Sequence, residues 1–256
     1  MNISVVTEFH LVGFAGPWKL QVFQAGIFIL IYLAALMGNG LIISITSWDP
    51  CLCTPMYFFL RNLSLFDLCL ISAVVPKTIV NSFTNSNYIS FLGCAAQVFL
   101  VAFSAATELF LLTAMSIDRF IAICHPLHYA LLMKRDTCVQ MTSLACLSGG
   151  LMSLIHTAST FSLSYCGLNE IKQFFCDIPQ LLAISCSEDI TAEVVLIIIN
   201  AIVFQNVSLA DIKETTDTIP EKLTEGNLME MSASKSVPED EEGDLEEAVQ
   251  EDKLTS

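Results

Sequence analysis

Charged residues are scarce in the greater part of this sequence. Only 14% of the 256 residues are charged and 54% are hydrophobic, whereas a soluble globular domain is about a quarter charged. Residues 1–204 hold just 11 acidic and 7 basic side chains, a net charge of −4. A segment of this length cannot bury so much apolar surface from water. The composition therefore excludes a soluble domain and predicts a protein embedded in lipid.

The sequence also lacks the motifs expected of an enzyme. We find no nucleophile–base pair, phosphate-binding loop or zinc motif that rises above chance. His125 and His128 are three residues apart, but no third ligand accompanies them, so we expect them to be loop residues. His156 lies in an apolar stretch and is expected to be a hydrogen-bonded core residue. The sequence therefore predicts no catalytic activity, no cofactor and no nucleic-acid partner.

Aromatic residues are absent after Phe204, and no further apolar stretch follows. Residues 205–256 contain 15 acidic and 4 basic side chains, a net charge of −11, which explains why the whole chain reaches −15. Low hydrophobicity combined with high charge predicts disorder. We therefore divide the chain into a membrane domain, residues 1–204, and an acidic tail, residues 205–256. A solvated tail is favoured over one that binds a basic partner.

Five apolar stretches dominate the membrane domain. A helix needs about 20 apolar residues to cross a hydrocarbon core of about 30 Å, and backbone groups inside a bilayer must bond to one another. An all-α membrane protein is therefore predicted. The first 21 residues lack the basic start and short apolar block of a cleavable signal peptide, so the first stretch is expected to insert the chain. The predicted spans are residues 22–47, 57–80, 92–123, 139–163 and 190–210.

Basic residues set the orientation of the chain. Arg119, Lys134 and Arg135 surround the short connection between the third and fourth spans, which places that connection in the cytoplasm by the positive-inside rule. The N-terminus is then outside the cell. Asn2 begins an Asn-Ile-Ser sequon there and is a candidate for glycosylation. The sequon at Asn62 falls at the cytoplasmic end of a span and should stay unmodified.

Four cysteines are expected on the outer side, where the environment is oxidising. Four such residues suggest two disulfides, and their spacing leaves three pairings open; they are Cys94, Cys166, Cys176 and Cys186. The remaining six are expected to be reduced thiols in the membrane or cytoplasm, and they are Cys51, Cys53, Cys69, Cys124, Cys138 and Cys146. Cys51 and Cys53 form a CxC pair without a partner ligand, which is a poor zinc site.

Three acidic residues lie inside predicted spans. Asp67 is in the middle of the second span, Glu108 is in the middle of the third, and Asp118 is near the inner end of the third. Charge inside a membrane is costly, and such residues usually face the interior of the helical bundle and serve a function. The alternative for Asp67 and Glu108 is that both are protonated and only hydrogen-bonded.

Two motifs carry a resemblance to a known family. Residues 55–60 read PMYFFL, and residues 115–129 read MSIDRFIAICHPLHY, which resembles the pattern MAYDRYxAICxPLxY. Residues 9–14, the pair Gly38-Asn39 and residues 62–64 also stand where odorant receptors of the rhodopsin type have matching segments. Ser116, Ile117 and Phe120 depart mildly from the pattern. The resemblance covers about residues 5–203, and signatures of the sixth and seventh helices are absent after Phe204.

The resemblance implies a rhodopsin-like helical bundle with about five of its seven helices. It implies a disulfide between Cys94 and Cys176 and a second one between Cys166 and Cys186, each worth about 2–4 kcal/mol. It also implies that Asp118 holds Arg119 at rest and releases it to a heterotrimeric G protein, although Arg119 as a simple interfacial anchor is the alternative. A pocket that can hold sodium is implied at Asn39, Asp67 and Glu108.

A small odorant is implied between the third, fifth and sixth helices. Small side chains share one face of the third span and leave room for such a ligand, although they equally permit close helix packing. Asn200 could instead bond to a neighbouring helix. The residues expected to line the ligand site are Val101, Ala102, Ala105, Ala106, Ile198 and Asn200.

The expected function is that of an odorant receptor in the plasma membrane, with its signalling impaired because helices six and seven are missing. The competing interpretation is a non-signalling interaction protein, a receptor fragment retained in the endoplasmic reticulum. A transporter or channel is disfavoured because no repeat symmetry is visible.

Overall fold

The structure is a computed structural model that describes residues 7–12, 18–48, 54–84, 87–165 and 169–186. All of them belong to one compact unit, Met1–Ser208. The fifth predicted span and the acidic tail lie outside the described residues, and the individual residues of our predictions that also lie outside them are Asn2, Cys51, Cys53, Cys166, Ile198 and Asn200.

Four long helices form the body of the protein. They are α1 (Trp18–Trp48), α2 (Pro55–Thr84), α3 (Phe91–Cys124) and α5 (Arg135–Phe161). Each is long and apolar enough to cross a membrane, which confirms the first four predicted helices. The ends differ by a few residues because a helix continues through polar turns that an apolar pattern does not register. Thus α5 begins at Arg135 rather than at residue 139.

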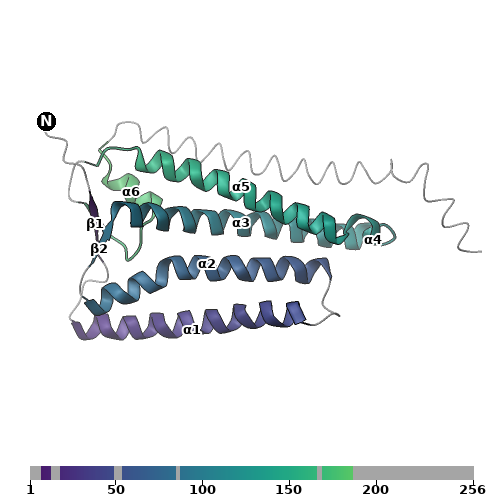
Figure 1. Cartoon of the computed structure of the whole chain (residues 1–256), viewed down its shortest axis with the longest axis horizontal. Helices are drawn as coiled ribbons and strands as arrows, with labels where there is room; N and C mark the ends of the chain where they lie inside the picture. Colours follow the sequence, from purple (N-terminus) through teal and green to yellow (C-terminus); the bar gives the residue numbers. More distant parts are fainter. Residues whose placement is uncertain (1–6, 13–17, 49–53, 85–86, 166–168, 187–256) are drawn as a thin grey trace, which may run out of the picture. The chain divides into compact units, whose positions relative to one another are not determined.

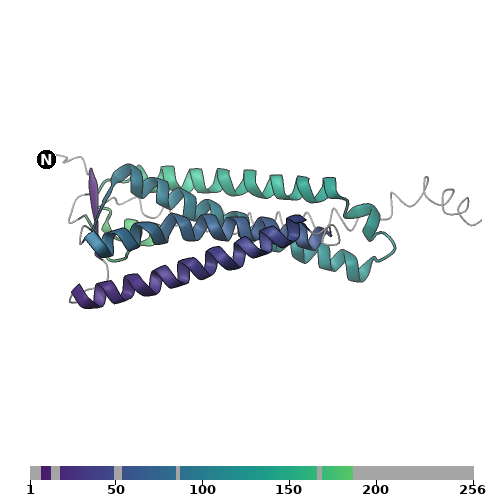
Figure 2. The same cartoon turned by 60° about the horizontal axis from the view of Figure 1, so that its bottom comes forward.

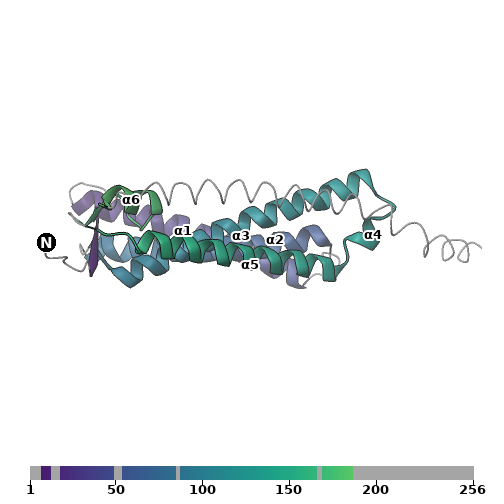
Figure 3. The same ribbon diagram turned by 90° about the horizontal axis from the view of Figure 1, so that it is seen from above.

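The helices pack in sequence order, α1 along α2, α2 along α3, and α3 along α5, as Figures 1 and 2 show. Figure 3 places the strand nearest the N-terminus and α6 (Ile178–Ile184) at one end of this bundle and the short helix α4 (Tyr129–Leu132) at the other. By the predicted orientation, that strand marks the outer end and α4 marks the inner end.

The bundle is apolar outside and partly polar inside. Phe23, Leu30 and Met37 of α1 are all more than 60% exposed, an arrangement that is unfavourable in water and suited to lipid. Small polar side chains fill the helix interfaces instead, among them Ser104 and Thr107 of α3, which are fully buried. This distribution is typical of membrane helices, whose association depends on close packing and not on hydrophobic burial.

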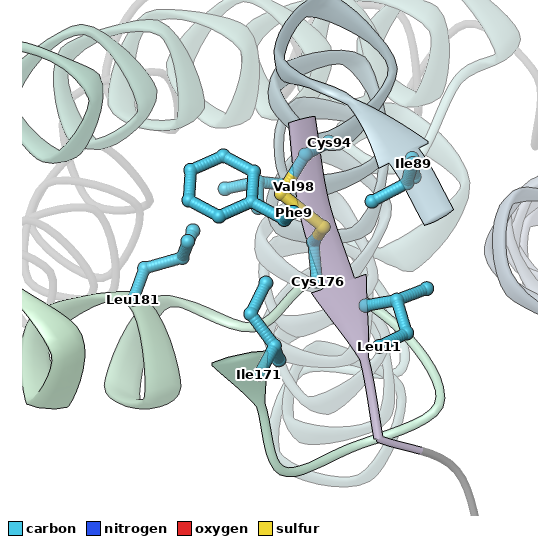
Figure 4. Close-up of a cluster of buried hydrophobic side chains, with 8 residues drawn as sticks. All are labelled: Phe9, Leu11, Ile89, Cys94, Val98, Ile171, Cys176 and Leu181. Carbon is cyan, nitrogen blue, oxygen red and sulfur yellow. A yellow bond between two sulfur atoms is a disulfide. The ribbon is translucent and has the colours of Figure 1, made fainter. Parts of the chain in front are cut away.

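A small sheet covers the outer end. Its strands are β1 (Glu8–Leu11), β2 (Tyr88–Ser90) and β3 (Glu170–Ile171), in the order β2-β1-β3. β1 is antiparallel to β2 and parallel to β3. Figure 4 shows the cluster of buried side chains beneath it, which we call the outer cluster; it consists of Phe9, Leu11, Ile89, Cys94, Val98, Ile171, Cys176 and Leu181.

β2 leads directly into α3, and Ser90 caps that helix. The Ser90 side chain accepts a hydrogen bond from the backbone N–H of Gly93 at 3.1 Å. Such a cap satisfies one of the free N–H groups at a helix start. The outer cluster and the cap together fix where α3 begins.

Helices α3 and α5 pack closely at Gly149. A Cβ atom at this position would lie 2.5 Å from Oγ1 of Thr107 and 3.1 Å from the Thr107 backbone nitrogen. Only glycine fits there. We expect Gly149→Leu to destabilise the bundle by at least about 1–3 kcal/mol, the usual cost of overpacking.

The matched control for this substitution is Gly40→Leu, because a Cβ at Gly40 meets nothing within 4 Å and leucine favours helix more than glycine does. Thermal unfolding in detergent, followed by circular dichroism, should show a lower midpoint for the first variant alone. Equal midpoints for the two variants would contradict the close contact.

Candidate functional site

The inner end of α3 carries a buried carboxylate with a defined partner. Asp118 is only 4% exposed, and its Oδ1 accepts a hydrogen bond of 2.9 Å from the hydroxyl of Tyr129 at the start of α4. Burial and the neighbouring Asp118 raise the pKa of Tyr129 to about 12. Tyr129 therefore keeps its proton at neutral pH, and its hydroxyl donates a hydrogen bond to the carboxyl group of Asp118.

Arg119 follows Asp118 in sequence but is exposed. Within the described part of the chain, Tyr129 and not Arg119 is the hydrogen-bonding partner of Asp118. Sequence reasoning quoted Tyr129 as part of a motif without giving it a role. The feature of the sequence that could have indicated this contact is Pro126, where the chain turns back from α3. That turn brings Tyr129, eleven positions after Asp118, beside it.

Asp67 of α2 and Glu108 of α3 lie in the middle of the bundle, close enough to interact electrostatically. Oε1 of Glu108 is buried without a hydrogen-bond partner. Asn39 is partly buried on α1. In the described ranges, no group of three or more His, Cys, Asp or Glu side chains could hold a metal ion. A sodium site at these residues remains a prediction.

The small side chains predicted to contact a ligand lie on the outer half of α3. Val101, Ala102, Ala105 and Ala106 are all partly buried. Their role remains a prediction, and the other two residues of the predicted ligand site fall outside the described ranges.

The outer end of α3 is tied to the segment that follows β3. Cys94 and Cys176 form a disulfide, with their Cα atoms 5.6 Å apart, which confirms the pairing implied by the resemblance. Cys186 is also disulfide-bonded, and its backbone N–H donates to the carbonyl of Ser164 at 3.0 Å. Because Cys166 lies outside the described residues, its pairing with Cys186 stays a prediction. The cysteines that remain free in the described residues are Cys69, Cys124, Cys138 and Cys146.

Gln97 supplies a second tie, which sequence reasoning missed. It is 5% exposed, its Nε2 donates to the carbonyl of Ala73 at 2.9 Å, and its Oε1 accepts from the backbone N–H of Cys176 at 2.8 Å. The sequence held an indication of this role, because Gln97 is a single amide in an apolar span. It follows Cys94 by about one helical turn and therefore lies on the same face of the helix.

Ala73 lies in the turn of α2 that precedes Pro76. A proline inside a helix removes a backbone hydrogen bond to the preceding turn and bends the helix there; Figure 1 shows the bend in α2. Two neighbouring helices contact this turn, since Tyr32 of α1 and Ser72 share a hydroxyl–hydroxyl hydrogen bond of 3.1 Å. Gln97 thus joins the bent turn of α2 to the disulfide segment.

The comparisons with known proteins agree with this geometry. Residues 38–210 match the family model described as 7 transmembrane receptor (rhodopsin family). The chain is 59% identical over 201 residues to human Olfactory receptor 14A16, covering 78% of this chain and 65% of that protein. It is 52% identical over 187 residues to human Olfactory receptor 14A2, covering 73% of this chain and 60% of that protein. The chain thus spans less than two thirds of the length of these curated relatives.

We expect Gln97→Met to weaken the outer end of the bundle. Methionine has a similar volume but leaves the N–H of Cys176 and the carbonyl of Ala73 without their partner, which should cost about 1–3 kcal/mol. Gln140→Met, at an exposed position of α5, is the matched control. Hydrogen exchange should become faster at Cys176 in the first variant only. Unchanged exchange there would show that the bridge contributes nothing.

Proposed function

This chain belongs to the rhodopsin family of seven-transmembrane receptors, with olfactory receptors as its relatives, and we propose that it binds a small volatile odorant and couples that binding to a G protein. The observation that carries the proposal is the 59% identity to Olfactory receptor 14A16 over 201 residues, which is 78% of this chain. The position of Asp118 and Arg119 at the inner end of α3 supports it.

The proposed ligand site is the outer half of α3. Val101, Ala102, Ala105 and Ala106 present small side chains there, and Ile198 and Asn200 would complete the site from the following span. Apolar walls with few polar groups suit a volatile molecule. Because a ligand shifts a conformational equilibrium only through different affinities for the two states, the odorant must favour a position of α3 that differs from the resting one.

The proposed switch is at the other end of the same helix. The hydroxyl of Tyr129 donates to Asp118 at 2.9 Å, and in this proposal that bond belongs to the resting position. Movement of α3 would break or lengthen that bond and change the position of the adjacent Arg119. The Arg119 side chain is exposed and permanently charged. A guanidinium at the cytoplasmic surface can then donate to acceptor groups of the G protein. A sodium ion between Asp67 and Glu108, near Asn39, would oppose the movement.

The protein is a multi-pass membrane protein, and we place it in the plasma membrane with its N-terminus outside and Asn2 glycosylated. Residues 1–204 form the receptor domain in this proposal, and residues 205–256 are a cytoplasmic acidic tail. Expressed by itself, the 256-residue chain should signal weakly, because the residues after Phe204 contain no further apolar stretch to supply the opposite wall of the cytoplasmic cleft.

The test compares the chain with a fusion in which residues 1–204 are followed by the corresponding remainder of Olfactory receptor 14A16. Both are expressed in cells with surface display verified, and odorant-evoked cyclic AMP is measured against a panel of volatiles. We expect a dose-dependent response from the fusion and less than about a tenth of that response from the chain. A loss of only about 1.4 kcal/mol in the stabilisation of the active state already lowers the population of that state about tenfold.

Arg119→Ala in the fusion should abolish the response, whereas Arg135→Ala, which also removes a charge from the inner surface, should retain it. A fusion that is displayed at the surface but gives no cyclic AMP response to any volatile in the panel would overturn the receptor proposal. Equal responses from chain and fusion would overturn the weak-signalling part alone. Endoglycosidase-sensitive glycans on the chain would instead favour a retained, non-signalling protein.

A further inference from the structure

A small cavity lies at the outer end of the bundle between α1 and α2. Its volume is about 30 Å³, and a buried water needs roughly 10–15 Å³ of such space, so about two water-sized groups fit. Its walls come mainly from α1, from α2 and from the segment that precedes Cys176, and the polar side chains in them are Gln21, Gln24, Thr78, Asn81, Ser82 and Asn87. The cavity is separate from the small-residue face of α3 proposed for the odorant.

Asn81 is the unusual residue in this wall. Its side chain is 6% exposed, and its Oδ1 is buried without any hydrogen-bond partner. A buried acceptor left unpaired is costly, and most buried polar side chains in folded proteins have a partner. An unpaired amide oxygen beside a cavity is available to accept a hydrogen bond from a molecule inside it.

The hydroxyl groups in the wall narrow the chemistry of that molecule. Oγ1 of Thr78 donates to the carbonyls of Val74 and Phe174 at 3.0 and 3.3 Å, and Oγ of Ser82 donates to the carbonyl of Thr78 at 2.9 Å. Each hydroxyl has one proton, so both oxygens are left only as acceptors. Together with Oδ1 of Asn81, they make this side of the cavity rich in acceptors.

Charge excludes two other classes of ligand. No Lys, Arg, Asp or Glu lines the cavity. A carboxylate or a cation would lose its hydration there without a counter-ion. A neutral hydrogen-bond donor remains. The rings of Phe28 and Phe174, whose centroids are 5.3 Å apart, provide an apolar wall for a short carbon chain.

We propose that this cavity is a binding site for the hydroxyl end of a small alcohol, which donates to Asn81. The site lies outside the odorant site and does not depend on signalling. Its occupant would also touch Phe174, two residues before Cys176, and would therefore hold the disulfide segment against α1 and α2. The site is thus placed to stabilise the outer end of the bundle.

The test uses the full chain in phosphatidylcholine nanodiscs and saturation-transfer NMR with two probes of three non-hydrogen atoms. Ethanol donates a hydrogen bond and acetonitrile does not. A ligand of this size reaches a dissociation constant of about 1 mM at best, so titrations extend through the millimolar range. We expect saturable binding of ethanol above the signal of empty nanodiscs, and no saturable binding of acetonitrile.

Asn81→Leu should weaken ethanol binding by about tenfold, the effect of losing one hydrogen bond to a buried group. Asn62→Leu is the matched control, because Asn62 bonds the carbonyl of Phe58 within its own helix at 2.8 Å. Since Asn81→Leu removes an unpaired acceptor, its thermal midpoint should not fall. Thr78→Val, which removes another acceptor with little change of shape, provides a second variant.

Three results would overturn the proposal. They are equal binding of ethanol and acetonitrile, ethanol binding that never saturates, and equal binding by the wild type and both cavity variants. The second result would mean that water alone occupies the cavity. None of them bears on the odorant response, so the failure of this site and of the receptor proposal are distinguishable.

Discussion

Water is absent from the hydrocarbon core of a bilayer, so a polar group of the four long helices is costly there unless it has a partner within the protein. Some short hydroxyl side chains find one locally; Ser44 and Thr113, for example, donate to the carbonyl four residues earlier in their own helices. Others, such as Ser104 and Thr107, are buried without a hydrogen-bond partner. The longer amide of Gln97 meets it across helices, between α2 and the disulfide segment. Asp118 has the hydroxyl of Tyr129. The cross-helix partnerships fix the relative positions of the elements, which the largely apolar outer surface cannot do.

The outer end of the bundle follows different physics, because water is present there and hydrophobic burial has its usual strength. Phe9 lies fully buried under the sheet, with its ring 5.4 Å from that of Tyr165 and 6.0 Å from that of Phe91. Segments from the N-terminus, from the start of α3 and from the region after β3 therefore share one core (Figure 4). The disulfide at Cys94 passes through this core and joins it to the bundle. Hydrophobic burial at this end thus complements hydrogen bonding and close packing in the membrane.

Hydropathy alone predicted the four described helices, because the length of an apolar stretch needed to cross lipid is nearly fixed. The disulfide to Cys176 needed the family resemblance, since spacing left three pairings open. The sheet could not be predicted: its strands are two to four residues long and join positions 78 and more residues apart. Gln97, Tyr129 and Gly149 were missed for a related reason. Each acts through one partner on another element, and a single sequence contains no record of which residues meet.

Helix α3 connects the two ends of the molecule. From Cys94 to Asp118 it rises by about 36 Å, with a disulfide and Gln97 at the outer end and Tyr129 at the inner end. Between them, Gly149 lets the backbone of α5 lie against Thr107. A rigid helix held at both ends cannot shift in its outer half without straining a bond at one end. The disulfide is covalent and the Tyr129 bond is worth only about 1–3 kcal/mol, so the inner bond yields first. A ligand that displaces the outer half of α3 would therefore act at Asp118.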